Sequence, residues 1–260
     1  MKCWHMSGAG NDFMVIDGRG LTPDYETLSR RLCALTNADG FMAVDYSQTA
    51  DFKLHFYNSD GSRGEMCGNG SRCICKFAYD NGIAGDTMVI EADAGPVPGW
   101  RLSENRYRVQ LNLPTTIDLQ RTPGAAYVEL GNPGLPHGVV ELPDLEFSDH
   151  PALLERAKQL RFCPDFPKGA NINFFTVTGE NQVRILTYER GVEDYTLACG
   201  TGCGSTAAVL WTTNRLPGGR LTLENQGGTL EVTITGTDRI EKLELEGPAE
   251  VLKVYDIDIV

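Results

Sequence analysis

The sequence predicts a mixed α/β fold of the α+β class, arranged as two pseudo-symmetric domains that arose by duplication. The chain has 260 residues, which is enough for two domains of about 100–150 residues, each with its own core. One block of sequence occurs twice, once in each half. Segments with the alternating or β-branched pattern of strands are more numerous than segments with helical spacing. We therefore expect two similar, strand-rich halves.

The repeated block centres on a Cys-Gly-x-Gly motif. It occurs as Cys67-Gly68-Asn69-Gly70 and again as Cys199-Gly200-Thr201-Gly202. Each motif opens a run with helical spacing, which stops at Asn81-Gly82 in the first copy and at Pro217-Gly218 in the second. A strand-like segment follows each run, at 87–91 and at 220–224. The two halves are thus expected to share the order of helix and strand around the motif.

Strand patterns fill much of the remaining chain. They occur at 52–57, 106–113, 126–130, 183–186, 230–234 and 242–245. Residues 114–121 look like a crossover between the halves. Residues 249–260 look like a strand that returns to complete the first half. The predicted domains are therefore 1–114 completed by 249–260, and 115–248.

The charge balance excludes one class of partner. The chain carries 23 Lys and Arg against 35 Asp and Glu, a net charge of −12. Binding to nucleic acid relies on clustered basic side chains that release counterions from phosphate, and the sequence contains no such cluster. We therefore expect no nucleic-acid partner.

The apolar pattern and the cysteines point to the cytoplasm. No apolar run approaches the roughly 18 residues of a membrane span, and the first residues lack the apolar stretch of a signal peptide. We expect no membrane partner and a reducing compartment, in which the eight cysteines stay free thiols. No Cys-x-x-Cys pair occurs, so we expect no metal site.

A cysteine at the start of a helix is a candidate acid or base. The helix dipole and the free N–H groups of the first turn favour an anion there, and such placement lowers a thiol pKa from about 8.5 to between about 3.5 and 7.5. The glycines let backbone N–H groups approach a carboxylate bound beside the sulfur. A single motif of this kind is more often a turn with good packing, but two copies in equivalent places favour chemistry.

Two such cysteines on opposite sides of one carbon can invert a stereocentre. A thiolate removes the proton from one face and a thiol delivers a proton to the other, and the two exchange roles for the reverse reaction. The two helix N-termini would hold the carboxylate on that carbon and stabilise the charge that grows during deprotonation. This scheme needs neither pyridoxal phosphate nor any other cofactor.

At these residues the sequence resembles the diaminopimelate epimerase family of cofactor-independent amino-acid racemases. The resemblance covers nearly the whole chain, and it rests on five segments: 8–13, 58–62, 65–73, 189–191 and 198–202. It implies two domains, each a mainly antiparallel, β-barrel-like sheet around a central helix. It also implies an active site in the cleft between the domains, a homodimer, and a role in the synthesis of lysine and of cell-wall precursors.

The resemblance also implies roles for particular residues. It implies that the two acid/base residues are Cys67 and Cys199, and that their partners near the reacting centre, holding its ammonium, are His137 and Glu189. The backbone cradle for the carboxylate would be formed by Gly68, Asn69, Gly200 and Thr201. The group that binds the distal amino-acid end of the substrate would be Asn11, Asn58, Asn171 and Arg190. Arg190 suits that task independently, because a guanidinium forks onto a carboxylate.

The sequence departs from the family pattern away from the cysteines. Four residues separate Asn132 from His137, which leaves the role of Asn132 open. Asn173 follows Asn171 by two residues, so either of the two could face the site. The expected activity is the interconversion of LL- and meso-2,6-diaminopimelate. A racemase of the same family for another amino acid, such as histidine, or one of broad specificity, is the alternative. A non-catalytic binding protein and a thiol redox or metal protein are the other classes considered.

Overall fold

The structure is a computed structural model that describes residues 1–64 and 67–258. It is mostly sheet with few helices, so the predicted mixed fold class is confirmed. The chain divides into two compact units. Unit 1 comprises Met1–Gln110 and Gly247–Val260, and unit 2 comprises Leu111–Glu246.

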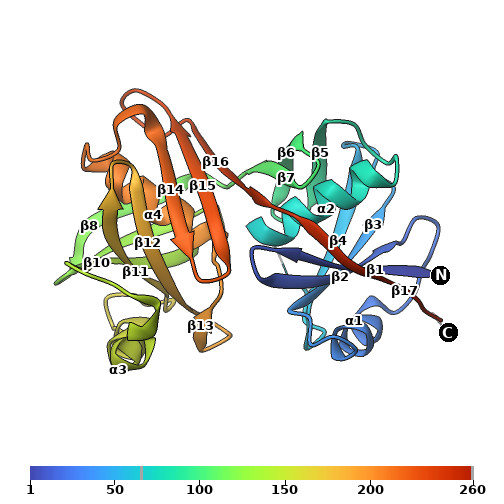
Figure 1. The fold of residues 1–260 in the computed structure, drawn as a ribbon, viewed down its shortest axis with the longest axis horizontal. Helices are drawn as coiled ribbons and strands as arrows, with labels where there is room; N and C mark the ends of the chain where they lie inside the picture. The colour runs from blue at the N-terminus through green and yellow to red at the C-terminus, as the bar shows by residue number, and fades with distance from the viewer. Residues whose placement is uncertain (65–66, 259–260) are drawn as a thin grey trace. The chain divides into compact units, whose positions relative to one another are not determined.

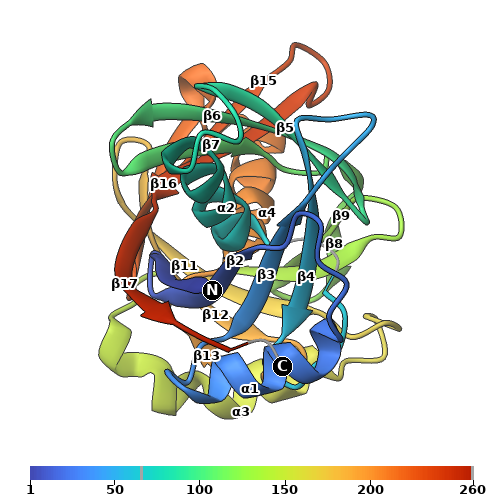
Figure 2. The ribbon, with the colours of Figure 1, turned by 90° about the vertical axis from the view of Figure 1, so that its right-hand side faces the viewer.

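Unit 1 is a curved sheet around one buried helix. Its strands are β1 (Lys2–Gly8), β2 (Asn11–Asp17), β3 (Gly40–Asp45), β4 (Phe52–Asn58), β5 (Thr87–Ala92), β6 (Gly95–Ser103), β7 (Arg106–Gln110) and β17 (Glu250–Asp256), and its helices are α1 (Tyr25–Ala34) and α2 (Gly68–Asp80). The strand order is β17-β1-β2-β3-β4-β5-β6-β7. The β2–β3 and β4–β5 pairs are parallel and the others are antiparallel. Because α2 contacts both β1 and β7, the sheet wraps around it (Figures 1 and 2).

Unit 2 repeats this arrangement around a second helix (Figure 1). Its strands are β8 (Pro114–Thr122), β9 (Ala125–Leu130), β10 (Leu135–Glu141), β11 (Asn171–Gly179), β12 (Gln182–Glu189), β13 (Asp194–Thr196), β14 (Arg220–Asn225), β15 (Gly228–Thr235) and β16 (Lys242–Pro248). Its α-helices are α3 (His150–Arg161) and α4 (Gly200–Thr212), and its 3-10 turns are Phe147–Asp149 and Pro217–Gly219. The order is β8-β9-β10-β11-β12-β14-β15-β16, with β13 paired to the far end of β12.

The two units correspond strand by strand. In each, a parallel pair follows the first long connection, and a second parallel pair follows the buried helix. In this correspondence β8, which pairs with β9, is the counterpart of β17, which pairs with β1. The interpretation of residues 114–121 as a crossover is therefore wrong. β8 is mostly half-buried, but its sequence, PTTIDLQRT, lacks the apolar alternation by which a strand is recognised.

The buried helices follow from their composition. In α2, apolar side chains such as Ile74 and Phe77 are buried, and Phe77 meets Trp4 edge-on at 4.9 Å between ring centroids. In α4, small residues allow strands to approach closely, and a Cβ added at Gly204 would lie 2.7 Å from the side chain of Leu111. The buried helix α2 also carries Arg72 and Lys76, whose side chains donate to the backbone carbonyls of Gly68 and Glu104.

The ends of the two helices test the sequence prediction. Both begin directly after their cysteine, and α2 ends at Asp80 with Asn81 as its C-cap, as predicted. The prediction that the second helix continues to Pro217 is wrong, because α4 ends at Thr212. Asn214 adopts a left-handed conformation with φ of 56°, which closes the helix one turn before the proline.

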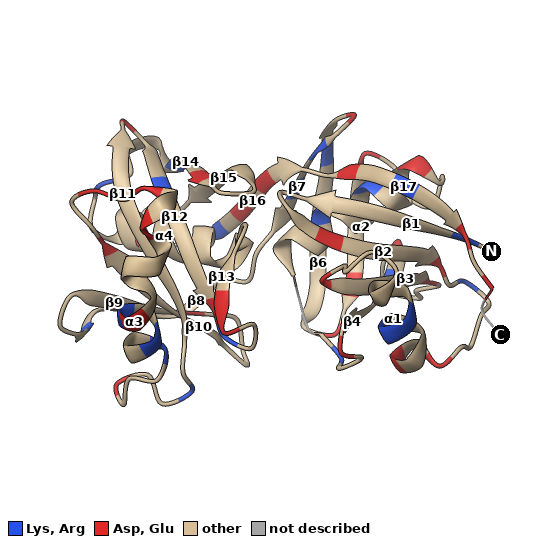
Figure 3. Cartoon of the chain, turned by 60° about the horizontal axis from the view of Figure 1, so that its bottom comes forward, with Lys and Arg blue, Asp and Glu red and all other residues tan. Residues whose placement is uncertain are grey.

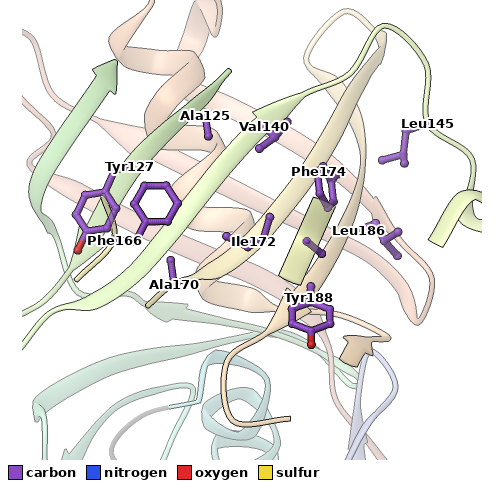
Figure 4. Packing of buried hydrophobic residues seen from close by; sticks show 11 residues of the cluster. Ala125, Tyr127, Val140, Leu145, Phe166, Ala170, Ile172, Phe174, Leu186 and Tyr188 are labelled. Atoms are coloured by element: carbon purple, nitrogen blue, oxygen red, sulfur yellow. The ribbon is translucent and has the colours of Figure 1, made fainter. Parts of the chain in front are cut away.

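A second apolar layer lies on the other side of the unit 2 sheet. Figure 4 shows side chains from β9 to β12, among them Ile172 and Phe174, that pack as one cluster. Phe166 stacks on Tyr127 at 5.4 Å between centroids, and the buried Ala157 of α3 joins the cluster. This layer fixes β10 and β11, the strands that carry the polar residues considered next.

Charged residues of both signs are dispersed over the helices, strands and loops of each unit in the view of Figure 3. Within the described part of the chain, none of the helices has the length and apolar character that crossing a membrane requires.

Candidate active site

Cys67 caps the buried helix of unit 1. Its backbone is extended, with φ of −128°, and its Sγ accepts the N–H of Gly70 at 3.4 Å. The space beside the glycine is tight, because a Cβ on Gly70 would lie 3.3 Å from the sulfur of Met42. The half-buried sulfur thus stands where the free N–H groups of the first turn gather. Two residues of the motif, Glu65 and Met66, lie outside the described residues.

A chain of hydrogen bonds behind Cys67 orients Asn11. The fully buried Arg72 donates to the carbonyl of Gly68 at 3.2 Å and to the side-chain oxygen of Asn69 at 2.9 Å. Asn69 in turn donates to the side-chain oxygen of Asn11, whose amide nitrogen donates to Asp39 at 3.1 Å. The side-chain amide of Asn69 is thus held within the protein, where it orients Asn11.

Asn58 lies at the end of β4 in the same unit. Its side chain donates to Ser62 at 2.9 Å, and its strand partner is Gly40, next to Asp39. The N–H of Ser59 also donates to the carbonyl of Asp39 at 3.1 Å. The structure therefore brings Asn58 and Asn11 to opposite sides of Asp39.

Cys199 caps the buried helix of unit 2 in the same way. Its Sγ accepts the N–H of Gly202 at 3.4 Å and lies 3.4 Å from the hydroxyl of Thr201. Burial, and then the negative charge of Glu189, raise the pKa of this thiol well above its ordinary value, against the two hydrogen bonds. The expectation of a lowered pKa is therefore wrong for Cys199, because desolvation outweighs the helix N-terminus.

The end of β12 holds the next two predicted residues. Glu189 closes the strand and pairs with Asp194 of β13. Arg190 follows it: its backbone N–H donates to the side-chain oxygen of Asn171 at 2.7 Å, and its guanidinium donates to the carbonyl of Lys168 at 3.1 Å. Asn171 thus fixes the backbone that carries Arg190.

His137 is fully buried in β10, opposite Asn171 of β11. Its Nδ1 lies 3.2 Å from the amide nitrogen of Asn173. Its Nε2 is buried and has no hydrogen-bond partner among residues 1–64 and 67–258. Burial, and then the positive charge of Arg190, lower the pKa of His137 to about 3, so the ring is neutral.

Sequence reasoning missed two residues that organise these half-sites, Arg72 and Asp39, and it left open whether Asn171 or Asn173 faces the site. Asn173 had a signal, since it lies two residues after Asn171 and side chains at that spacing share one face of a strand. Arg72 had one too, because it follows Gly68 by one helical turn. Asn132 lies exposed in the turn between β9 and β10. Among the described side chains, no group of three or more His, Cys, Asp or Glu is arranged to hold a metal ion.

Comparisons with known proteins cover nearly the whole chain. The family model described as diaminopimelate epimerase matches residues 3–110 and 130–252. The chain is 34% identical to the diaminopimelate epimerase of Aquifex aeolicus (strain VF5), over 98% of this chain and 96% of that protein. It is 36% identical to the diaminopimelate epimerase of Flavobacterium psychrophilum, over 96% and 97%. The structure of a hydroxyproline epimerase from Agrobacterium vitis covers 99% of this chain and 90% of its own with a TM-score of 0.75 and 15% identity, a likeness of fold.

Proposed function

The chain belongs to the diaminopimelate epimerase family, and we propose that it interconverts LL-2,6-diaminopimelate and meso-2,6-diaminopimelate. One structural observation supports this proposal in addition to the family membership. Cys67 and Cys199 are the N-caps of corresponding helices, and each sulfur accepts an N–H from the glycine three residues on. A duplicated fold thus keeps the same acid/base group in both halves.

We propose a two-base mechanism for these cysteines. One sulfur, as a thiolate, removes the α-proton of the substrate, and the other, as a thiol, delivers a proton to the opposite face. The carbon is then inverted, and each sulfur has exchanged its protonation state. Inversion by this route needs both sulfurs to reach one carbon.

The protonation of Cys199 sets the direction in which the resting enzyme starts. Because the pKa of Cys199 is held well above its ordinary value, this residue rests as a thiol and is the proton donor. Cys67 is then the base for the substrate whose α-proton faces unit 1. To invert a centre of the opposite configuration, Cys199 must be the base, so Cys199 must first lose its proton and Cys67 must gain one.

The first turns of α2 and α4 supply the electrostatic part of the mechanism. We propose that the backbone N–H groups of Gly68, Asn69, Gly200 and Thr201 hold the carboxylate on the reacting carbon. Removing the α-proton moves negative charge onto that carboxylate, and fixed N–H donors stabilise it without reorganisation. Losing one such donor costs on the order of 3 kcal/mol of transition-state stabilisation in enzymes that use them.

The distal end of the substrate carries a second amino-acid group. We propose that Arg190 binds its carboxylate and that Asn11, Asn58 and Asn171 position its polar atoms. The support is local. Arg190 is held through its own backbone by Asn171, and Asn11 is oriented by Asn69 and Asp39.

The activity is tested by proton exchange in D2O, followed by NMR under reducing conditions. LL-diaminopimelate is compared with a panel of single amino acids that includes histidine. We expect deuterium to enter diaminopimelate, with the meso form appearing, and no exchange in the panel. Exchange only into another amino acid would replace the substrate, and exchange into none would refute the proposed activity. Cys163→Ser, which changes a half-buried cysteine of unit 2, is the control for Cys67→Ala and Cys199→Ala.

We also propose that the protein acts in the cytoplasm as a homodimer. The described cysteines are free thiols, as a reducing compartment requires. β17 exposes Val251, Leu252 and Val254, an apolar surface on a strand that pairs with β1 on one side. Light scattering on the purified protein is expected to give twice the mass of the chain, and Leu252→Lys is expected to shift it to the mass of one chain. A monomeric wild-type protein would contradict the dimer.

A further inference from the structure

The side-chain amide of Asn173 has one possible orientation. Its nitrogen lies 2.9 Å from the carbonyl oxygen of Gly138, and its oxygen accepts the hydroxyl of Thr187 at 3.0 Å. Turning the amide over would set its oxygen against the oxygen of Gly138, and two acceptors do not bond. Asn173 is itself fully buried, so no water replaces these contacts.

That orientation fixes the proton on His137. The amide nitrogen of Asn173 has two hydrogens; one goes to Gly138, and the other points at Nδ1 of His137, 3.2 Å away. A ring nitrogen that accepts a hydrogen bond carries no proton. His137 is therefore neutral, with its proton on Nε2.

We propose that Asn173 is a positioning residue that holds His137 in the neutral Nε2–H tautomer, so that His137 enters the reaction as a hydrogen-bond donor. The inference rests on the proposed function for its catalytic consequence. The Nε2–H group is buried and finds no acceptor within the described part of the chain. An anionic oxygen of the bound amino acid would satisfy it.

This assignment changes the role that the family resemblance implies for His137. An N–H group cannot accept a hydrogen bond from the substrate ammonium, since both would be donors. It can stabilise the carboxylate oxygens of the reacting centre, where negative charge grows as the α-proton leaves. His137 then acts in the same way as the helix N–H groups, and the ammonium of the substrate is held by Glu189.

Asn173 links the tautomer of His137 to Cys199 through the packing at the start of α4. A Cβ built on Gly202 would lie 2.1 Å from the side-chain oxygen of Asn173 and 3.1 Å from the hydroxyl of Thr187. Asn173 therefore packs against the first turn of α4, whose Gly202 N–H is bonded to the sulfur of Cys199. The side-chain amide of Asn173 fits against the helix because Gly202 has no side chain.

The tautomer is measured directly in the resting protein. Two-bond 1H–15N correlation spectra of protein labelled with 15N-histidine distinguish protonated from unprotonated ring nitrogens. The chain has four histidines, and His137→Gln assigns the signal. We expect Nδ1 of His137 to be unprotonated and Nε2 protonated at pH 7. A protonated Nδ1 would overturn the proposal. No substrate is present, so this outcome is independent of whether the protein epimerises diaminopimelate.

Asn173→Asp tests the role of the amide. In an ionised aspartate the oxygen that replaces the amide nitrogen loses the bond to Gly138 and can only accept from Nδ1 of His137. This requires a proton on Nδ1 and leaves Nε2 of neutral His137 as an acceptor. We expect the tautomer to invert, kcat to fall on the order of 10- to 100-fold with a smaller change in KM, and the pH profile of kcat to shift. Asn105→Asp, the same change in an exposed turn, should alter none of these. An unchanged tautomer would refute the positioning role. An inverted tautomer with wild-type kcat and pH profile would refute the donor role of His137.

Discussion

At the scale of single residues, the two cysteines occupy the same position but differ in their surroundings. Cys199 is 3% exposed and lies near the carboxylate of Glu189, whereas Cys67 is half-buried. Helix N-termini stabilise an anion in both places. For Cys199 this effect is smaller than the cost of burying a thiolate beside another negative charge. The duplicated motif thus provides the same side chain in both halves, and we propose that the local surroundings make Cys199 the resting acid.

Glu189→Gln tests this explanation of Cys199. Removing the negative charge is expected to lower the pKa of the thiol, so alkylation of Cys199 should begin at a lower pH than in the wild-type protein. Mass spectrometry of the peptide that contains Cys199 measures the modification as a function of pH. Glu224→Gln removes an exposed carboxylate of the same unit and should leave the profile unchanged. If Glu189→Gln also leaves it unchanged, the charge of Glu189 does not act on the thiol.

The neutral state of His137 predicts a pH dependence of stability. Its pKa is about 3 in the folded protein, below the ordinary value of 6.5, so the unfolded chain binds a proton that the folded chain does not. Its contribution is therefore present above pH 6.5 and is lost as pH falls toward 3, at about 1.4 kcal/mol per pH unit. Urea unfolding of wild-type protein and His137→Gln between pH 7 and pH 4 measures the difference in slope. Equal slopes would show that His137 titrates normally.

At the scale of elements, each half-site is a helix start that the adjacent strands support. Cysteine at the N-cap and glycine within the first turn could both be predicted from the sequence, because they belong to a local motif. β8 could not, since its sequence carries no apolar alternation. The contact of Asn173 with His137 and Thr187 joins three strands, and no local sequence pattern predicts such a contact.

Gly202→Ala tests the packing at the start of α4. Alanine in place of glycine inside a helix normally stabilises it by about 0.5–1 kcal/mol. Here the added Cβ would meet the side chain of Asn173 at 2.1 Å, so we expect loss of stability and of activity together. Gly85→Ala is the control, because a Cβ there meets open space. A more stable and fully active Gly202→Ala protein would show that the close packing is not needed.

At the scale of the whole molecule, the duplication accounts for the path of the chain. The counterpart of β8, the first strand of unit 2, is β17, which comes last in the sequence and pairs with β1. The first half is thus completed only when the C-terminal strand returns. The repeated motif and the reaction class could be read from the sequence, because the duplicated chain carries the same motif in both halves. The raised pKa of Cys199 could not, since it depends on burial.

The central claim is that two different groups act on the two faces of one carbon. The most direct measurement is the early course of the reaction of LL-diaminopimelate in D2O, with deuterium measured separately in substrate and product. A two-base enzyme returns the original proton to the substrate and delivers a solvent deuteron to the product. The account therefore predicts deuterium in the meso product at early times, while the recovered LL substrate keeps its α-proton. Deuterium appearing equally fast in the recovered substrate would indicate a single base and would contradict the account.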